Sequence, residues 1–185
     1  MKKTILCLTL IYSFFNIDID ARVLPQDVIW NNDETGYYTI DENSIVLVST
    51  IGKKDRKILS SEDVKNKKIE SFSFSQDKKN VLIFTNSVRV WRYNTRGNYW
   101  VYNLKTKQGK RLGSTLPDRS LMFAKFSPNG KKIAYVSKEI IPNSFRNSST
   151  RANIYLETVE DNSIVKLTES DEKGKIINGT FDWVY

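Results

Sequence analysis

The sequence predicts an all-β protein built from repeated four-stranded antiparallel sheets. The first observation is an internal repeat: residues 74–85 and 126–137, 52 positions apart, share an aromatic residue, Ser, a polar turn, Lys and an apolar run. This pattern is typical of a strand, a tight turn and a second strand. The second observation is that the repeat continues on both sides of these segments, and the third is that helical periodicity is nearly absent. Repetition of a piece of sheet at this period indicates a repeat architecture.

Further strands follow each repeated segment in the same order. They are expected at residues 99–104 and 110–112 after the first segment, at 154–159 and 164–167 after the second, and at 36–40, 43–48 and 56–59 in an earlier, fainter copy. The best candidate for a helical segment is a weak turn at residues 61–67. Four-stranded units of about 50 residues in series are the blades of a β-propeller.

The hydrophobic pattern indicates that some strands are buried on both faces. Residues 45–48, 81–84 and 133–136 are continuous apolar runs, whereas a strand with one wet face alternates. Stacking of each blade between two neighbours explains such runs, and the core of a β-sandwich is the alternative. We expect a partial β-propeller of about three four-stranded antiparallel blades, plus the first strand of the next blade at residues 176–185. Closed propellers need at least four blades, so we expect the first part of a larger protein.

The amino-terminal residues have the pattern of an export signal. Lys2 and Lys3 precede an apolar run over residues 5–15, which is too short to be a stable membrane anchor. A buried first strand is the alternative. The expected organisation is a signal peptide at residues 1–21 and the partial propeller at residues 22–185. The localisation that follows is periplasmic or secreted.

The net charge of +8 is concentrated at predicted turns and strand ends. The basic clusters are at residues 53–57, 65–68, 105–111 and 131–132. Solvated hairpin tips and protected sheet edges explain them better than a nucleic-acid surface, so no nucleic-acid partner is expected.

The composition gives no support for catalysis by this chain alone. Histidine is absent, and no Gly-x-Ser-x-Gly elbow occurs, so a Ser-His-Asp arrangement cannot be assembled from these residues. The acidic residues Glu169, Asp171 and Glu172 lack the ligand spacing of a calcium loop and are interpreted as a solvated turn. We therefore predict no catalytic residue, no metal ligand and no cofactor.

One segment interrupts the repeat. Residues 86–98 form an insertion rich in arginine and aromatic residues, including Trp91 and Arg92. The guanidinium group is a rigid fork of donors suited to carbonyl and carboxylate oxygens. The alternative is a long hairpin whose arginines are solvated or pair with a neighbouring blade.

The insertion and the segments around it resemble the amino-terminal propeller of dipeptidyl peptidase IV and its relatives in the prolyl oligopeptidase family. The resemblance rests on residues 90–93 and 99–104, on residues 122–136, and on the ending Ile176-Ile177-Asn178-Gly179-Thr180-Phe181-Asp182-Trp183-Val184-Tyr185. The Trp-Arg insertion and the Gly-x-x-Asp-Trp-Val-Tyr ending are specific to that branch, whereas the Phe-Ser-Pro-x-Gly turn is common to many propellers.

The resemblance implies a role within a larger enzyme. In this family an eight-bladed propeller caps a carboxy-terminal α/β-hydrolase domain, and dipeptides with Pro or Ala second are removed from free amino ends. The arginine that matches Arg92 binds a backbone carbonyl of the substrate, and the acidic residues that hold the substrate ammonium follow the motif matching residues 182–185. Implied partners are thus the peptide amino terminus and the hydrolase domain, and a homodimer is left open. The segment 138–151 departs from the family pattern and is expected to be a loop near the cavity mouth.

Two functions of different class remain open. The first is the non-catalytic propeller portion of an exported serine exopeptidase, which gates and orients the substrate through Arg92. The second is a stand-alone propeller-like peptide- or protein-binding module, which is not part of an enzyme and closes its ring by oligomerisation.

Overall fold

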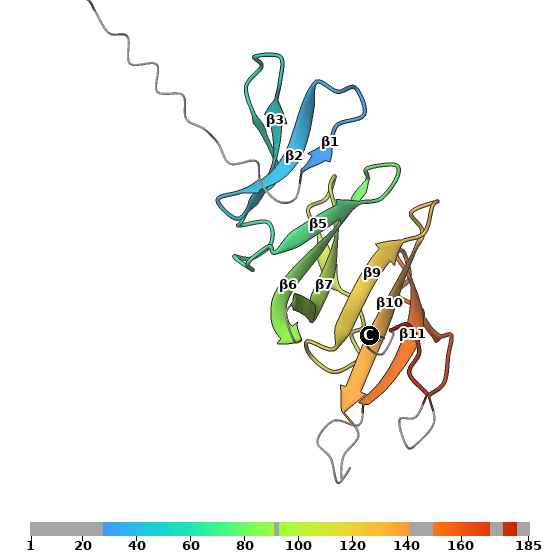
Figure 1. The fold of residues 1–185 in the computed structure, drawn as a ribbon. Coiled ribbons are helices and arrows are strands. Elements are labelled where there is room, and N and C mark those ends of the chain that lie inside the picture. Colours follow the sequence, from blue (N-terminus) through green and yellow to red (C-terminus); the bar gives the residue numbers. More distant parts are fainter. Residues whose placement is uncertain (1–27, 91–92, 141–149, 171–175, 181–185) are drawn as a thin grey trace, which may run out of the picture.

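The computed structural model describes residues 28–90, 93–140, 150–170 and 176–180 (Figure 1). Within these residues the chain is all-β, with twelve strands and no helix. The strands are β1 (Ile29–Trp30), β2 (Gly36–Asp41), β3 (Ser44–Ser49), β4 (Arg56–Leu59), β5 (Ser71–Phe74), β6 (Asn80–Val90), β7 (Tyr93–Asn103), β8 (Gly109–Arg111), β9 (Leu121–Phe126), β10 (Lys132–Ile140), β11 (Thr150–Thr158) and β12 (Ile164–Lys166).

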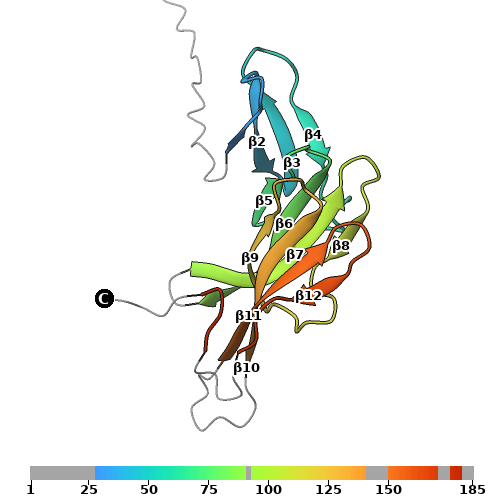
Figure 2. The ribbon, with the colours of Figure 1, turned by 90° about the vertical axis from the view of Figure 1, so that its right-hand side faces the viewer.

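The strands form three antiparallel four-stranded units in chain order. Blade 1 is β1–β4, blade 2 is β5–β8 and blade 3 is β9–β12, and in each blade sequential strands are neighbours. A single backbone pair, Gly97 with Leu121, joins β7 of blade 2 to β9 of blade 3. Figures 1 and 2 show the three blades following one another along the molecule. The prediction of a partial β-propeller is confirmed, and β1 is an additional edge strand that the sequence pattern did not predict.

The repeated segments make the same turn twice. The hydroxyl groups of Ser75 and Ser127 each donate to the side-chain oxygen two residues later, at 2.7 and 2.8 Å. The backbone N–H groups of Lys78 and Gly130 then close the turn on the Ser75 and Ser127 carbonyls, both at 2.8 Å, with φ of 52° and 69°. Such local bonds compete with strand pairing, so Ser and Asx residues stop one strand and start the next.

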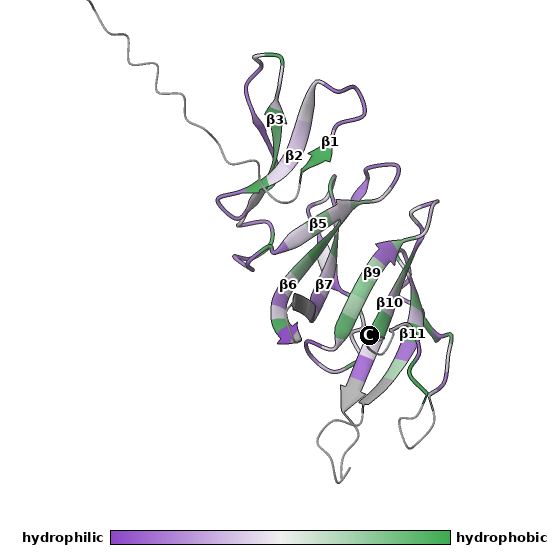
Figure 3. Cartoon of the chain, in the orientation of Figure 1, coloured by the Kyte–Doolittle hydropathy of each residue, from purple (hydrophilic) through white to green (hydrophobic). Residues whose placement is uncertain are grey.

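Apolar clusters fill the two spaces between the blades. Val81 and Ile83 of β6 belong to the cluster shared with blade 1, and Leu82, between them in sequence, belongs to the cluster shared with blade 3. Because successive side chains of a strand point to opposite faces, β6 is buried on both sides. The prediction from the continuous apolar run at residues 81–84, that this strand is buried on both faces, is confirmed. Figure 3 shows hydrophobic stretches along β3, β6 and β9 and mainly hydrophilic residues in the turns.

The segment expected to be a loop at residues 138–151 is partly strand. β10 and β11 remain paired as far as Ile140 and Thr150, so the ladder extends into both ends of this segment. The β-branched Ile140 and Thr150 favour extended backbone. Residues 141–149, with Pro142, lie outside the described residues.

Residues 177–179 lie beside β11 of blade 3. Ile177 forms a parallel bridge with Ala152, and the N–H of Asn178 donates to the Ala152 carbonyl at 3.0 Å. A Cβ atom on Gly179 would lie 2.5 Å from a methyl carbon of Val136. Ile177 and Asn178 are therefore bonded to the edge of β11 in blade 3, and the rest of the strand predicted for the next blade, residues 181–185, lies outside the described part.

The basic clusters differ in their surroundings. Residues 53–57 are exposed, as expected of a solvated turn. Lys107, in contrast, donates to the carbonyl of Ile58 in blade 1, and Lys110 donates to the carbonyl of Thr158 in blade 3 at 3.2 Å. These two lysines of blade 2 connect blades, so the expectation of uniformly solvated tips was wrong for them.

The predicted signal segment, residues 1–21, lies outside the described residues. In the part of the chain that the structure describes, no helix has the length and apolar character needed to cross a membrane.

Candidate functional site

Residues 86–97 of the insertion at 86–98, which we call the arm, are an extension of the β6–β7 hairpin. β5 pairs with β6 only at residues 81–84, whereas β6 and β7 continue to pair beyond them, ending with Val90 opposite Tyr93. Trp91 and Arg92 lie between these two in sequence and outside the described residues. The role of Arg92 therefore stays a prediction, but the segment that carries it is described on both sides.

A β-bulge marks the base of the arm. Thr85 pairs with Asn98 and Val88 pairs with Arg96, so Asn86 and Ser87 together face the single residue Gly97. Asn86 has φ of 53°, a conformation that Asn tolerates better than most residues. A bulge bends its strand and redirects the residues that follow.

Gly97 is required by close packing at this bulge. A Cβ atom here would lie 2.6 Å from Cε2 of Phe84 and 2.8 Å from the carbonyl oxygen of Thr85. Neither distance is compatible with a side chain, so glycine lets the two strands approach where the arm leaves the blade.

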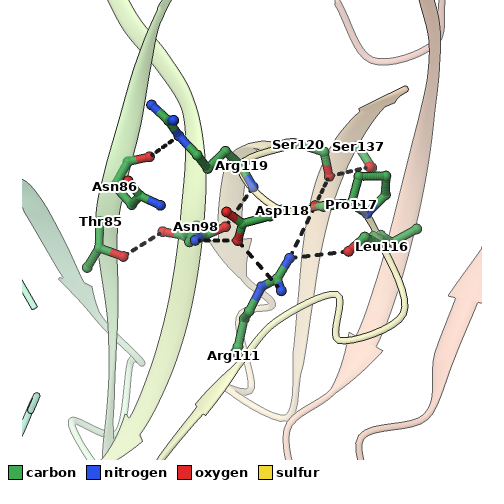
Figure 4. Close-up of polar contacts among 10 residues, drawn as sticks. All are labelled: Thr85, Asn86, Asn98, Arg111, Leu116, Pro117, Asp118, Arg119, Ser120 and Ser137. Atoms are coloured by element: carbon green, nitrogen blue, oxygen red, sulfur yellow. Dashed lines mark hydrogen bonds and ion pairs between the residues drawn. The ribbon is translucent and has the colours of Figure 1, made fainter. Parts of the chain in front are cut away.

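Arg119 holds the bulge from the side of blade 3. Its Nε donates to the carbonyl of Asn86 at 3.2 Å, and its Nη2 donates to the carbonyl of Ser87 at 3.1 Å. The backbone N–H of Arg119 donates to Oδ1 of Asn98 at 2.9 Å, and Nδ2 of Asn98 donates to Asp118 at 2.9 Å (Figure 4). The link between β8 and β9 is therefore bonded to both strands at the base of the arm.

Arg111 fixes the link from below. Its Nη2 donates to the carbonyls of Leu116 and Pro117 at 3.2 and 3.1 Å, and its Nη1 lies 3.7 Å from Oδ1 of Asp118. The hydroxyl of Ser120 donates to the Pro117 carbonyl at 2.7 Å (Figure 4). The backbone that presents Arg119 is thus held by several side chains.

Glu70 contacts the bulge from the opposite side. Its Oε1 accepts a hydrogen bond from the backbone N–H of Ser87 at 2.8 Å, and its own N–H donates to the carbonyl of Phe84 at 2.9 Å. The peptide groups of Ser87 are therefore bonded on one side to a carboxylate and on the other to a guanidinium. Hydrogen bonds that involve a charged group are stronger than neutral ones.

A groove of about 460 Å³ lies at the base of the arm. It is lined by Lys67, Lys68, Glu70, Thr85, Asn86, Ser87, Asn98 and Trp100. The ammonium group of Lys67 lies 4.2 Å from the centre of the Trp100 ring, a cation–π contact, and burial lowers the pKa of this lysine. The groove offers hydrogen-bond donors and one carboxylate that is already engaged with Ser87, an arrangement suited to orienting a polar chain.

Blade 3 has an extended hairpin in the same place as the arm. β10 and β11 correspond to β6 and β7 in the repeat, and they stay paired to Ile140 and Thr150. Figure 1 shows the ends of β6 and β10 pointing to the same end of the molecule. Two successive blades therefore extend their central hairpins from one end of the propeller.

The acidic residues considered for calcium do not form a site in the described part. Glu169 pairs with Lys166, its Oε1 lying 2.6 Å from the lysine Nζ, and Asp171 and Glu172 lie outside the described residues. Among the residues that the structure describes, no group of three His, Cys, Asp or Glu side chains could hold a metal ion.

Sequence reasoning did not identify Arg119, Glu70 or Asn98 as parts of the site. Arg119 and Glu70 bind backbone groups of a segment 17 to 33 residues away, and such partners leave no pattern in the sequence. The one available signal was Asn86, a residue tolerant of positive φ inside an otherwise strand-like insertion.

Comparison with known proteins agrees with this architecture. The family model described as "Dipeptidyl peptidase IV (DPP IV) N-terminal region" matches residues 75–185. Dipeptidyl aminopeptidase B of Saccharomyces cerevisiae is 29% identical over 171 residues, which are 90% of this chain and 19% of the yeast protein. Prolyl endopeptidase FAP of Homo sapiens is 28% identical over 156 residues, 84% of this chain and 19% of the human protein. The chain thus spans about a fifth of the length of these relatives.

Solved structures share the fold. The crystal structure of Porphyromonas gingivalis dipeptidyl peptidase 4 superposes with a TM-score of 0.64 and 21% identity, covering 84% of this chain and 21% of that one. The tricorn protease superposes with a TM-score of 0.52 and 12% identity, over 78% of this chain and 13% of that one. The family match covers more than half of the sequence and includes the arm and blade 3, and the chain belongs to the family of dipeptidyl peptidase IV N-terminal regions.

Proposed function

We infer that this chain is the non-catalytic propeller portion of a serine exopeptidase that removes X-Pro and X-Ala dipeptides from peptide amino termini. The observation that carries the proposal is the arm: a hairpin with a bulge and charged contacts at its base, placed where the family resemblance puts a substrate-binding arginine. In the complete enzyme, a carboxy-terminal α/β-hydrolase domain would supply the nucleophilic serine and the rest of the triad. This portion would gate access and orient the substrate.

Arg92 is the residue proposed to touch substrate. Its guanidinium would donate to a backbone carbonyl near the free amino end of the peptide, while acidic residues elsewhere in the complete protein would hold the ammonium group. Fixing both groups sets the distance from the amino terminus to the bond that is cut, which makes a dipeptide the product. The residues at the base of the arm support this role because orientation requires a donor that does not move.

Export is part of the same proposal. The charged and apolar pattern of residues 1–21 supports a cleaved signal peptide and a periplasmic or secreted enzyme.

The first experiment is to sequence the coding region downstream of Tyr185. Codons for a run of glutamates, followed some hundreds of residues later by a Gly-x-Ser-x-Gly motif, are expected. A stop codon followed by unrelated sequence would favour the alternative, a binding module that closes its ring by oligomerisation. The second experiment measures hydrolysis of Gly-Pro-p-nitroanilide by the 185-residue chain, and no turnover is expected.

The role of Arg92 is tested in the complete enzyme by Arg92→Ala. Loss of a charge-assisted hydrogen bond, worth about 1.5–3 kcal/mol, should lower kcat/KM roughly 10- to 100-fold. The matched control is Arg56→Ala, which removes an exposed arginine at the edge of blade 1 and should leave the kinetics unchanged. Equal kinetics of the two variants would remove Arg92 from the substrate site.

A further inference from the structure

We propose that Arg119 is a positioning residue for the arm, and that through the arm it sets the affinity for the peptide substrate that Arg92 is proposed to bind. The inference rests on the proposed function for its substrate part and on contacts within the described residues for its structural part.

The carbonyl groups of the bulge are held by Arg119. Asn86 and Ser87 interrupt the regular pairing between β6 and β7, because two residues there face Gly97 alone. Carbonyl groups at a bulge lose their ladder partners and need others. Arg119 supplies donors to both, at 3.2 and 3.1 Å, from one rigid planar group. A single side chain therefore fixes the orientation of two successive peptide planes.

Ser87 is also bonded through its backbone N–H group, to Glu70. The N–H of Ser87 donates to Glu70, which lies directly before β5, whereas Arg119 lies two residues before β9. Ser87 is thus held between side chains that enter two different blades. A shift of the blade 3 link relative to blade 2 would be transmitted to the bulge, and the arm would change direction with it.

A small rotation at the bulge would produce a larger displacement at the far end of the arm. Val90 lies three residues beyond Ser87, about 10 Å along an extended strand at roughly 3.3 Å per residue. A rotation of about 10° at the bulge would therefore move the backbone at Val90 by roughly 2 Å. Displacement of a binding group by about 1 Å is enough to weaken orientation strongly. The contacts at the base of the arm are where such a rotation is prevented.

The backbone of Arg119 is itself held in place by hydrogen bonds. Its φ is 57°, which is costly for a residue with a side chain and persists only where surrounding contacts enforce it. Those contacts are the bond from its own N–H to Asn98 and the bond between Asn98 and the preceding Asp118 (Figure 4). The exposed guanidinium therefore starts from a fixed backbone, which limits its reach to the two carbonyls.

The structural part is tested on the 185-residue chain by amide hydrogen exchange. Arg119→Ala should speed exchange in peptides covering residues 87–96 about tenfold and leave β11 unchanged. Lys125→Ala, which removes an exposed cation on β9, is the matched control and should change neither. Unchanged exchange in the arm of Arg119→Ala would overturn the proposal, whatever the function of the protein.

The substrate part is tested in the complete enzyme by a double-mutant cycle. Arg119→Ala should raise KM for Gly-Pro-p-nitroanilide about five- to twentyfold with little change in kcat, and Arg119→Lys should recover part of the loss. In an Arg92→Ala background, Arg119→Ala should have no further effect on KM. Additive effects, or a loss of thermal stability with KM unchanged, would show that Arg119 does not act through Arg92. Unchanged KM in Arg92→Ala alone would instead contradict the proposed function.

Discussion

The carboxylate of Glu157 in β11 accepts a hydrogen bond from the backbone N–H of Gly113, at 2.9 Å, in the link that leaves blade 2. The hydroxyl of Tyr135 donates to the same carboxylate oxygen at 3.0 Å. Glu157 is only 2% exposed and lies beside the apolar cluster between blades 2 and 3. A buried charge with two donors therefore ties blade 3 to the preceding link.

Removal of this carboxylate should destabilise the chain strongly. In Glu157→Ala, the N–H of Gly113 and the hydroxyl of Tyr135 lose their buried acceptor, so the free energy of unfolding should fall by about 3 kcal/mol. Glu157→Gln keeps an acceptor of the same shape and should lose about 1 kcal/mol. Urea unfolding followed by circular dichroism gives both values. Equal losses in the two variants would mean that side-chain volume, and not the hydrogen bonds, accounts for the effect.

Three tyrosines should make the fold sensitive to alkaline pH. Burial raises the pKa of Tyr99, Tyr102 and Tyr135, and for Tyr135 the charge of Glu157 adds to this effect. The unfolded chain loses these protons near pH 10, whereas the folded chain retains them above it. Their contribution to stability is thus fully present below about pH 10 and is lost as pH rises further, by about 1.4 kcal/mol per pH unit for each tyrosine.

Tyr135→Phe isolates one of these contributions. The variant should start from a lower stability at pH 8, since Glu157 loses a donor, but its stability should fall less steeply between pH 10 and 11. Burial lowers the pKa of Lys110, so the contribution of this lysine to stability rises with pH, opposite to that of the tyrosines. Comparison of the variant with the wild type at each pH cancels the effect of Lys110. Parallel pH profiles for the two proteins would contradict the assignment to Tyr135.

The lysines that connect blades should contribute to stability, unlike their exposed neighbour. Lys107→Ala removes the bond to the Ile58 carbonyl, and Lys110→Ala removes bonds to the carbonyl of Thr158 and to Asn162. Each change should lower the free energy of unfolding by about 1 kcal/mol. Lys105→Ala, in the same turn but exposed, should be neutral. Thermal unfolding of the three variants side by side makes the comparison, and a loss for Lys105→Ala as large as for the others would point to net charge as the cause.

The repeated turns should respond differently to acid. Asp77 accepts a hydrogen bond from the hydroxyl of Ser75, which lowers its pKa, while Asn129 accepts the equivalent bond from Ser127. The contribution of Asp77 is present above its ordinary pKa of about 3.8 and is lost as pH falls below it. Asp77→Asn should therefore be slightly less stable than the wild type at pH 7 and should lose less stability as pH falls below about 3.8. The reciprocal Asn129→Asp should lose more, and identical acid profiles for all three proteins would refute the prediction.

The local pattern of the sequence was sufficient to predict the blades. Ser75 and Ser127 each precede a polar turn and an apolar run, and both form the expected hairpin. β1 escaped prediction because two residues at a sheet edge are too few to show a period. The extended ladder near Ile140 escaped because Pro142 and nearby Ser and Asn residues signal a loop.

The candidate site was harder to predict for a physical reason. The Trp-Arg motif identifies the arm, but the residues that hold it act through backbone carbonyls and amides. Any sequence supplies such groups at every position, so the pairing of Arg119 with Asn86 or of Lys107 with Ile58 depends only on the three-dimensional arrangement. The charge pattern alone therefore suggests that these side chains are solvated. Their backbone partners become visible only in the three-dimensional arrangement of the blades.

The position of β6 between two apolar clusters limits which amino-acid substitutions this strand can accept during evolution. Val81 and Ile83 face one neighbour and Leu82 the other, so no side of the strand is free to drift toward polar residues. A systematic substitution scan should find every consecutive position intolerant there, without the every-second-residue tolerance of a sheet that faces water. Sequence variation in such a molecule is pushed out of the blades and into the hairpin ends, which is where new binding properties can arise without rebuilding the body.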